Sequence, residues 1–256
     1  IMPSLVGSEM CIRDRHKAAD RLQYWLRQVS RKPGEWYYLK LDISKYFYRV
    51  DHLILLDILS RRIKDQRLMQ LLSEIINSED TRFGLPAGVS PEDCPEEQWL
   101  NDVGMPIGNL TSQLFANIYL NELDQLCKHE FHIHYYIRYM DDVIILSDDK
   151  RELAELKEHI ETFLNLELHL DLNKKTAIRP CYDGIDFVGY RIWATHRKLK
   201  KQTARRMIRN VKRMCEEMAV GNLSREEFDR VVASYKGVLP VSYTHLRAHE
   251  TRHALV

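Results

Sequence analysis

Apolar residues recur at helical spacing in several long segments of the chain and run together in a few short ones. The helical spacing predicts helices at 16–30, 52–63, 67–76, 110–129, 151–166, 197–218 and 224–239. The Pro33-Gly34 pair ends the first of these, and Asp51 is expected to cap the second. A capping box from Ser224 to Glu227 is expected to open the last.

Four short runs rich in aliphatic and aromatic residues predict strands, at 36–43, 132–140, 143–147 and 186–193. The second and third form a predicted hairpin, and the fourth is expected to be one short strand bent at a glycine. Residues 78–104 hold three prolines, three glycines and several acids, which predicts a loop or lid. Strands mixed with helices, followed by an all-helical end, predict an α+β fold.

Composition narrows the class of protein. The 256 residues, 45% hydrophobic, suffice for one large domain or two modest ones. No run reaches the roughly 20 apolar residues of a membrane-spanning helix, and the start lacks a secretory signal pattern. The five cysteines form no CxxC pair, which argues against a disulfide framework or a zinc knuckle. We therefore expect a cytoplasmic protein without a membrane partner.

Charge is unevenly distributed along the chain, although the net charge is only +1. Residues 197–213 hold nine Lys or Arg and no acid, so the rest of the chain is net negative. Such segregation is typical of a surface that binds a polyanion, but a solvated helix face would have the same composition. Charge alone leaves both interpretations open.

Three aspartates lie beside strongly apolar segments. Asp42 ends a predicted strand, and Asp141 and Asp142 lie at the tip of the predicted hairpin. Singly, each is ordinary turn chemistry, but aspartate is depleted in strands and both runs suit a sheet interior. Mg²⁺ prefers carboxylate oxygens on rigid supports, and adjacent strands, about 4.8 Å apart, would bring these side chains together. Together they indicate a site for divalent cations.

Five segments carry a more specific signal: YLKLDISKYF, GMPIGNLTSQLFANIYLNELD, YIRYMDD, LNKKT and FVGYRI. In order and spacing they resemble the palm motifs of reverse transcriptases, which are RNA-directed DNA polymerases. The resemblance implies a right-hand palm, an antiparallel sheet packed on helices, with partial fingers and a truncated helical thumb. It implies that Asp42, Asp141 and Asp142 hold two Mg²⁺ ions, which Mn²⁺ can replace, Asp42 and Asp141 being the more essential.

The resemblance also assigns roles to other positions. Lys175 would protonate the leaving pyrophosphate, and Phe47 would be a steric gate that excludes a ribose 2′-hydroxyl. The implied nucleotide-binding residues are Ile43, Phe47, Gly108 and Gln113, and those for primer and template are Gly104, Pro106, Gly189, Tyr190, Arg205 and Arg209. Each has a plainer alternative, such as a core aromatic, an ordinary helix start or an exposed cation. The implied partners are an RNA template, a DNA or RNA primer and deoxynucleoside triphosphates.

The subclass depends on Gln113, which follows Ser112. Many relatives, including group II intron enzymes, have proline there, whereas IGNLTSQ resembles the enzymes of diversity-generating retroelements. These copy a template RNA with frequent errors at adenines, and an accessory protein of the retroelement would then be a partner. The alternatives are a group II intron-like, retron or defence-associated reverse transcriptase, a two-metal nuclease, and an inactive fragment that binds nucleic acid.

We divide the chain into a remnant of the fingers at 16–35, a palm at 36–192 with the loop insertion 78–104, and a partial thumb at 193–240. Residues 1–15 and 241–256 resemble translated sequencing-adapter sequence, and we expect them to have no function. Because the earlier fingers motifs and the rest of the thumb are missing, this chain is expected to be weakly active or inactive although its parent is a polymerase.

Overall fold

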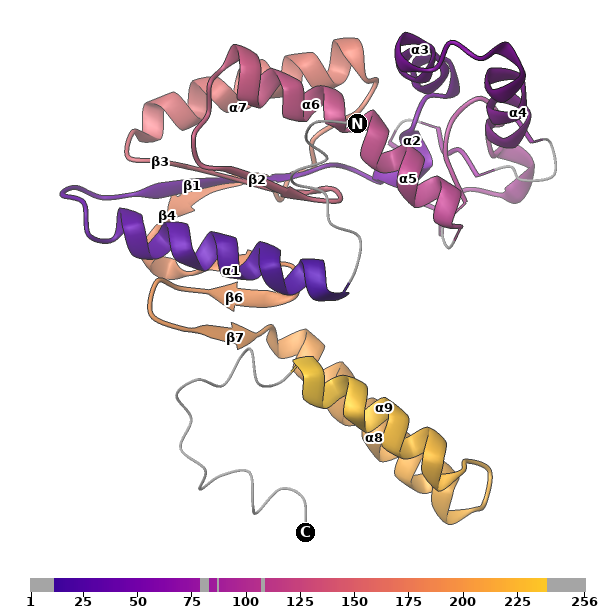
Figure 1. The fold of residues 1–256 in the computed structure, drawn as a ribbon, viewed down its shortest axis with the longest axis vertical. Helices are drawn as coiled ribbons and strands as arrows, with labels where there is room; N and C mark the ends of the chain where they lie inside the picture. Colours follow the sequence, from indigo (N-terminus) through magenta and orange to yellow (C-terminus); the bar gives the residue numbers. More distant parts are fainter. Residues whose placement is uncertain (1–11, 79–82, 87, 107–108, 239–256) are drawn as a thin grey trace. The chain divides into compact units, whose positions relative to one another are not determined.

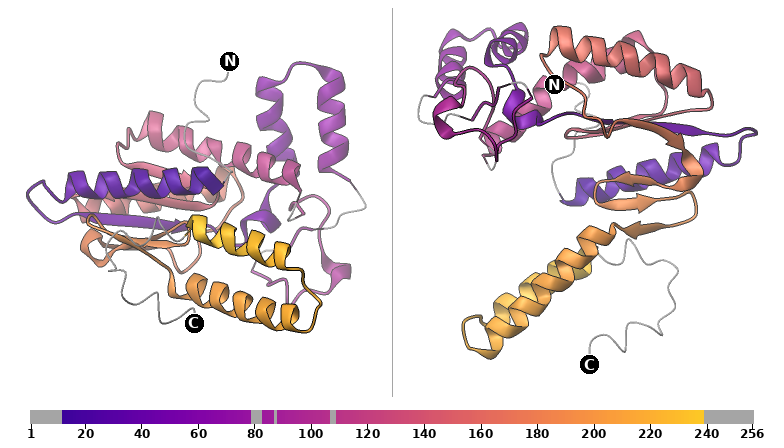
Figure 2. Two further views of the ribbon diagram at one scale, coloured as in Figure 1. Left: turned by 60° about the horizontal axis from the view of Figure 1, so that its bottom comes forward. Right: turned by 180° about the vertical axis from the view of Figure 1, so that it is seen from behind.

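The structure is a computed structural model that describes residues 12–78, 83–86, 88–106 and 109–238. The chain forms two compact units (Figures 1 and 2). The first comprises Tyr37–Arg179, and the second comprises the described parts of 9–36 and 180–256. Each unit combines an antiparallel sheet with helices, so the predicted α+β class is confirmed.

The first unit is built on a four-stranded sheet in the order β2-β3-β1-β4. Both β1 and β2 pair with β3 in antiparallel fashion, which confirms the predicted hairpin. Its first strand begins at Tyr136, four residues later than the apolar run suggested. The strands are β1 (Tyr37–Asp42), β2 (Tyr136–Tyr139), β3 (Asp142–Ser147) and β4 (Ala177–Pro180).

Helices of the first unit follow the predicted periods closely, with one exception. The helix predicted at 110–129 is divided into two α-helices and a π-helical turn. The helices are α2 (Tyr46–Arg49), α3 (His52–Arg62), α4 (Gln66–Ile76), η1 (Glu96–Gln98), α5 (Leu110–Tyr119), α6 (Asn121–Gln125), η2 (Leu126–Glu130) and α7 (Lys150–Glu167).

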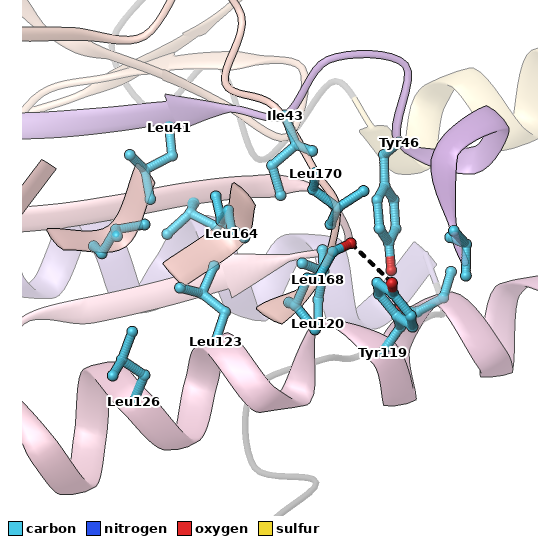
Figure 3. Close-up of a cluster of buried hydrophobic side chains, with 14 of the residues drawn as sticks. Leu41, Ile43, Tyr46, Tyr119, Leu120, Leu123, Leu126, Leu164, Leu168 and Leu170 are labelled. Atoms are coloured by element: carbon cyan, nitrogen blue, oxygen red, sulfur yellow. Dashed lines mark hydrogen bonds between the residues drawn. The ribbon is translucent and has the colours of Figure 1, made fainter. Parts of the chain in front are cut away.

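The core of this unit lies between the sheet and the helices α5, α6 and α7. Alternation along β1 sends Leu39 and Leu41 towards the helices and Lys40 towards the other face. Figure 3 shows Leu41 and Ile43 beside Leu164, Leu168 and Leu170 of the α7 end and Leu120 and Leu123 of the α5–α6 segment. Such burial fixes the end of β1, where Asp42 lies.

The second unit pairs α1 (Ile12–Val29) with a three-stranded antiparallel sheet in the order β5-β6-β7. The single bent strand predicted at 186–193 was wrong, because positive φ angles at Val188 and Gly189 reverse the chain into two strands. The unit contains η3 (Cys181–Asp183), β5 (Ile185–Phe187), β6 (Tyr190–Ile192), β7 (Arg197–Leu199), α8 (Lys201–Ala219) and α9 (Arg225–Val238).

The basic stretch also starts differently from its prediction. Arg197–Leu199 pairs with β6 instead of forming helix, and α8 begins at Lys201. Backbone pairing with a neighbouring strand overrides the helical preference of a short segment. Ser224 and Glu227 form the predicted capping box at the start of α9, since Glu227 N donates to Ser224 Oγ and Ser224 N to Glu227 Oε2. None of the helices in the described residues is long and apolar enough to cross a membrane.

Candidate active site

Asp42 and Asp142 occupy the last rung of the β1–β3 ladder, where they are direct partners. Directly opposed residues of an antiparallel pair point to the same face, with Cβ atoms about 4.5–5.5 Å apart. The two carboxylates therefore share the face of the sheet opposite the helix-packed core. Lys40, two residues before Asp42, reaches this face too, and its Nζ lies 2.6 Å from Asp142 Oδ1.

Asp141 lies in the two-residue turn between Tyr139 and Asp142, which are the last partners of the β2–β3 hairpin. Burial raises the pKa of its carboxyl group, and the negative charges of Asp142 and Asp42 raise it further. A hydrogen bond to its own backbone and the charge of Lys40 act in the opposite direction. The hairpin tip thus concentrates negative charge that a divalent cation would offset.

The donor atoms at the hairpin tip fit a hard divalent cation, although the side chains are not arranged around one. Within the described ranges, no group of three or more His, Cys, Asp or Glu side chains is gathered closely enough to hold an ion as the side chains stand, and Asp142 contacts Lys40 instead. The donor chemistry fits nevertheless, because carboxylates on the adjacent strands β1 and β3 and in the β2–β3 turn supply the hard oxygen ligands that Mg²⁺ takes. Asp42 and Asp141 are the main residues that would bind such an ion.

The backbone of Asp42 is fixed by the segment that follows α7. Asp42 N donates to Thr176 Oγ1 at 3.1 Å, and its carbonyl oxygen accepts from Asn173 N at 2.7 Å. The LNKKT segment therefore lies beside the end of β1. Lys175 is exposed there, with its backbone N bonded to Asn173 Oδ1. Thr176 is a supporting residue that sequence reasoning missed.

A second missed feature is the buried Arg138 on β2, whose side chain is 2% exposed. Its Nε and Nη2 donate to the two oxygens of Asp124 at 2.8 and 2.6 Å. Burial would lower the pKa of Arg138, but its bond to Asp124 and the charge of that carboxylate raise it more, so the guanidinium stays charged. The signal was present, since a cation two residues before the turn of an apolar hairpin must have a partner.

The residues assigned to the nucleotide lie in the first unit. Phe47 belongs to α2 and is partly buried, and its carbonyl accepts from Met105 N at 2.7 Å. Gln113 is half-buried on α5. The side chain of Ile43 is 2% exposed and belongs to the core, so its backbone is the part that a nucleotide could contact. Gly108 lies outside the described residues.

The structure gives a reason for glycine at position 104 that the sequence did not reveal. Its φ is +89°, and a Cβ there would lie 2.8 Å from the Cα of Gly84, so two backbone segments of the 78–104 loop pack directly together. Pro106 lines a cavity of about 400 Å³ with Gly104, Met105, Asn109 and Ser112, among others. The loop before α5 therefore borders a hollow beside the helix that carries Gln113.

The remaining predicted residues belong to the second unit. Gly189 has φ +86° in the β5–β6 turn. Tyr190 is 1% exposed and its hydroxyl is 3.1 Å from His16 Nε2, so its ring supports the turn from inside. Arg205 and Arg209 are exposed on α8.

Comparison with known proteins agrees with this geometry. The family model described as reverse transcriptase (RNA-dependent DNA polymerase) matches residues 6–192. Protein YkfC of Escherichia coli is 28% identical over 211 residues, which cover 69% of this chain and 52% of that protein. The COX1/OXI3 intron 2 protein of Saccharomyces cerevisiae is 26% identical over 204 residues, 62% of this chain and 24% of that protein. The chain thus spans about half or less of these relatives.

Solved structures with a similar fold include telomerases. Telomerase from Candida tropicalis, in complex with a fragment of telomeric RNA, superposes with a TM-score of 0.54 at 15% identity, over 83% of this chain and 38% of that one. Telomerase from Candida albicans gives 0.53 at 13% identity, over 76% and 35%. These likenesses concern the fold. The match to the family model over most of the chain, together with the carboxylates on adjacent strands, identifies this protein as a member of the reverse transcriptase (RNA-dependent DNA polymerase) family.

Proposed function

We propose that this chain carries the catalytic palm of an RNA-directed DNA polymerase that adds deoxynucleotides to a primer 3′-hydroxyl on an RNA template. The observation that carries the proposal is the rung formed by Asp42 and Asp142, with Asp141 next to it in the turn. Family membership implies catalysis that depends on divalent metal ions. Two Mg²⁺ ions, when bound, would supply an activated primer hydroxyl and charge neutralisation on the leaving pyrophosphate.

The residues of this chain would divide the work. Asp42 and Asp141 hold the metals, and Lys40, 2.6 Å from Asp142, offsets part of the negative charge beside them. Lys175, exposed next to the segment that binds the Asp42 backbone, carries the proton for the pyrophosphate. Gln113, Pro106 and the backbone of Ile43 contact the nucleotide or template. Arg205 and Arg209 on α8 contact phosphates without reading sequence, so affinity for the duplex falls as salt rises.

The test is extension of a DNA primer on an RNA template with Mg²⁺. We expect Asp141→Ala to lower the rate roughly 10²- to 10³-fold, a loss typical of removing electrostatic stabilisation from a site of this kind. The matched control is Asp148→Ala, an exposed aspartate at the end of the same hairpin, which should keep the rate. EDTA should abolish extension. Equal rates for the two variants would refute the assigned site, and a primer that shortens would indicate a nuclease.

Phe47 is the proposed sugar gate. We expect Phe47→Ala to raise incorporation of ribonucleotides relative to deoxynucleotides at least tenfold, because a rigid ring no longer meets the 2′-hydroxyl. The control is the neighbouring aromatic change Tyr48→Ala. The Tyr48 ring stacks on Phe83 of the 78–104 loop, with 4.7 Å between the ring centroids. Unchanged sugar selectivity in a folded Phe47 variant would remove the gate from the proposal.

The subclass proposal is an enzyme of a diversity-generating retroelement, supported by Gln113 after Ser112. Such an enzyme should make its errors mainly opposite template adenines, which sequencing of the extension products measures. The similarity to a yeast intron protein favours the group II intron-like alternative. Errors spread evenly over the four template bases would support that alternative.

A further inference from the structure

The turn that carries Asp141 has an unusual backbone. Met140 has φ +56°, a left-handed conformation that a residue with a Cβ adopts rarely. Glycine or asparagine is the usual residue where a two-residue hairpin needs positive φ. In this hairpin, the conformation must therefore be held by contacts from outside the turn.

Arg138 supplies the first of these contacts. Two of its nitrogens are bound to the carboxylate of Asp124, and the third, Nη1, donates to the carbonyl oxygen of Met140 at 3.0 Å. Because the peptide unit is planar, a fixed Met140 oxygen also fixes the orientation of the Asp141 amide. The guanidinium thus reaches from a buried ion pair to the backbone of the strained turn.

Asn117 on α5 supplies the second. Its Nδ2 lies 3.3 Å from Met140 Sδ, and its Oδ1 accepts from Arg138 Nη1 at 3.3 Å. The same Nδ2 donates to the carbonyl oxygen of Gln113 at 3.0 Å. One amide therefore joins the helix assigned to the nucleotide with both the side chain of Met140 and the arginine that holds its backbone.

The network is rigid at its base. Asp124 on α6 also accepts the hydroxyl of Tyr136 at 2.6 Å, so each of its oxygens has a partner inside the unit. A fork of planar donors can bind a carboxylate and a carbonyl at once, whereas a lysine presents a single charged centre on a flexible stem. The ion pair with Asp124 uses Nε and Nη2 of Arg138, so Nη1 can donate to the carbonyl oxygen of Met140 in the turn.

We propose that Arg138, held by Asp124 and Asn117, is a positioning residue that keeps Met140 left-handed and so sets the place of the Asp141 carboxylate. The inference rests on the proposed function, because only that function gives the Asp141 carboxylate a metal to bind. It also couples α5 to the metal-binding turn. Asn117 contacts both Met140 and Arg138, so a displacement of this residue on the helix would shift both contacts that fix Met140.

The test compares Arg138→Lys with Arg61→Lys, a matched control whose arginine makes two ion pairs on the surface of the same unit. Amide hydrogen exchange of Asp141 and Asp142 is the readout, in a protein whose cooperative melting shows that it is folded. We expect exchange to rise at least tenfold in Arg138→Lys, with α7 amides unchanged, and to stay at the wild-type rate in Arg61→Lys.

Rescue separates positioning from general stability. Glycine adopts positive φ without strain, so Arg138→Lys with Met140→Gly should recover at least half of the lost protection on a logarithmic scale. If Arg138→Lys does not fold, Asn117→Ala replaces it, because that change leaves the Asp124 pair in place; we expect at least a threefold rise. Wild-type exchange in the folded variant, or no recovery with glycine, overturns the proposal.

A second readout tests the link to metal. In folded Arg138→Lys, the Mn²⁺ or Mg²⁺ concentration for half-maximal extension should rise about tenfold, and Met140→Gly should lower it again. The exchange measurement needs neither metal nor nucleic acid. It therefore decides the positioning proposal even where Asp141→Ala leaves extension unchanged and the proposed function itself fails.

Discussion

Two charged regions lie within a few residues of each other on one hairpin and differ in their balance of charge. Before the turn, Arg138 and Asp124 form a buried bidentate pair in which each nitrogen and oxygen has a partner. In the turn and just after it, Asp141 and Asp142 lie near Asp42, and Lys40 contacts Asp142. The first region is neutral and closed, whereas the second keeps an excess of negative charge.

The difference teaches which charges serve the fold and which serve the site. A buried pair is tolerated when geometry satisfies both partners, and then removal of one partner is severe. At the open site, burial and the negative charges of Asp142 and Asp42 raise the pKa of Asp141, so the metal-free fold disfavours the charged form of this carboxyl group. A cluster of this kind is expected where binding of a cation supplies the missing charge.

The largest effect is expected at the closed pair. Arg138→Met should lower the free energy of unfolding by about 3–5 kcal/mol, because the Asp124 carboxylate, only 16% exposed, loses its cationic partner. Urea denaturation followed by circular dichroism measures it. Arg138→Met with Asp124→Leu should recover most of the loss, since apolar residues of similar volume replace a buried pair well. A single variant that loses less than about 1 kcal/mol would contradict the contrast.

The open cluster should respond in the opposite direction. Asp141→Asn is expected to stabilise the metal-free protein at pH 7, by roughly 1 kcal/mol, because the amide removes a charge that the fold disfavours. The sign follows from the raised pKa of Asp141. The folded state binds more protons than the unfolded state, so wild-type stability falls as pH rises above the ordinary aspartate range, near 4.

The pH series checks that sign. The advantage of Asp141→Asn should vanish at low pH, where the wild-type carboxyl group is protonated, and should grow as pH rises through the raised pKa. Thermal melts in EDTA between pH 4 and pH 8 measure it. An Asp141→Asn variant that is less stable than wild type at pH 7 would show that the cluster is balanced after all.

Lys40 tests the electrostatics of the open cluster more gently. Lys40→Met should tighten binding of Mn²⁺ to the chain about threefold to tenfold, since a cation near the site repels the metal by roughly 1 kcal/mol. Electron paramagnetic resonance of free Mn²⁺ measures the affinity. The control is Lys157→Met, whose ammonium pairs with Glu161 on α7 and should not matter. Weaker binding in Lys40→Met would assign this lysine to the support of the ligands.

The smallest effect is expected for an exposed ion pair. Arg61 contacts Asp57 and Glu122 at 2.7 and 3.0 Å, distances like those of Arg138, but its side chain is 57% exposed. Arg61→Ala should change the free energy of unfolding by about 0.5 kcal/mol or less. A loss comparable to that of Arg138→Met would show that pairing, and not burial, separates the two regions.

Local signals predicted much of this fold because they act within one element. The caps at Asp51 and Ser224, the period of α7 and the hairpin around Asp141 all depend on near neighbours. The β5–β6 reversal and the strand at Arg197–Leu199 depend on pairing between segments, which a single-sequence pattern does not contain. The same division explains why the sequence did not reveal that Gly104 packs against Gly84.

The candidate site follows the same rule. The three aspartates were predicted from their unusual place beside apolar strands, and the structure brings Asp42 and Asp142 to one rung. Their supports were missed, because Thr176 and Asp124 lie far along the chain from the residues they bind. No local pattern marks a hydroxyl or carboxylate whose partner is more than ten positions away.

The rung shared by residues 42 and 142 has a consequence for errors in assembly. Side chains alternate along a strand, so a slip of β1 by one position against β3 would turn Leu39 and Leu41 away from the helices and drive the aspartate into their apolar packing. A misaligned sheet would therefore lose its core packing together with the pairing of Asp42 and Asp142. A molecule that is stable enough to persist therefore already holds Asp42 and Asp142 opposite one another.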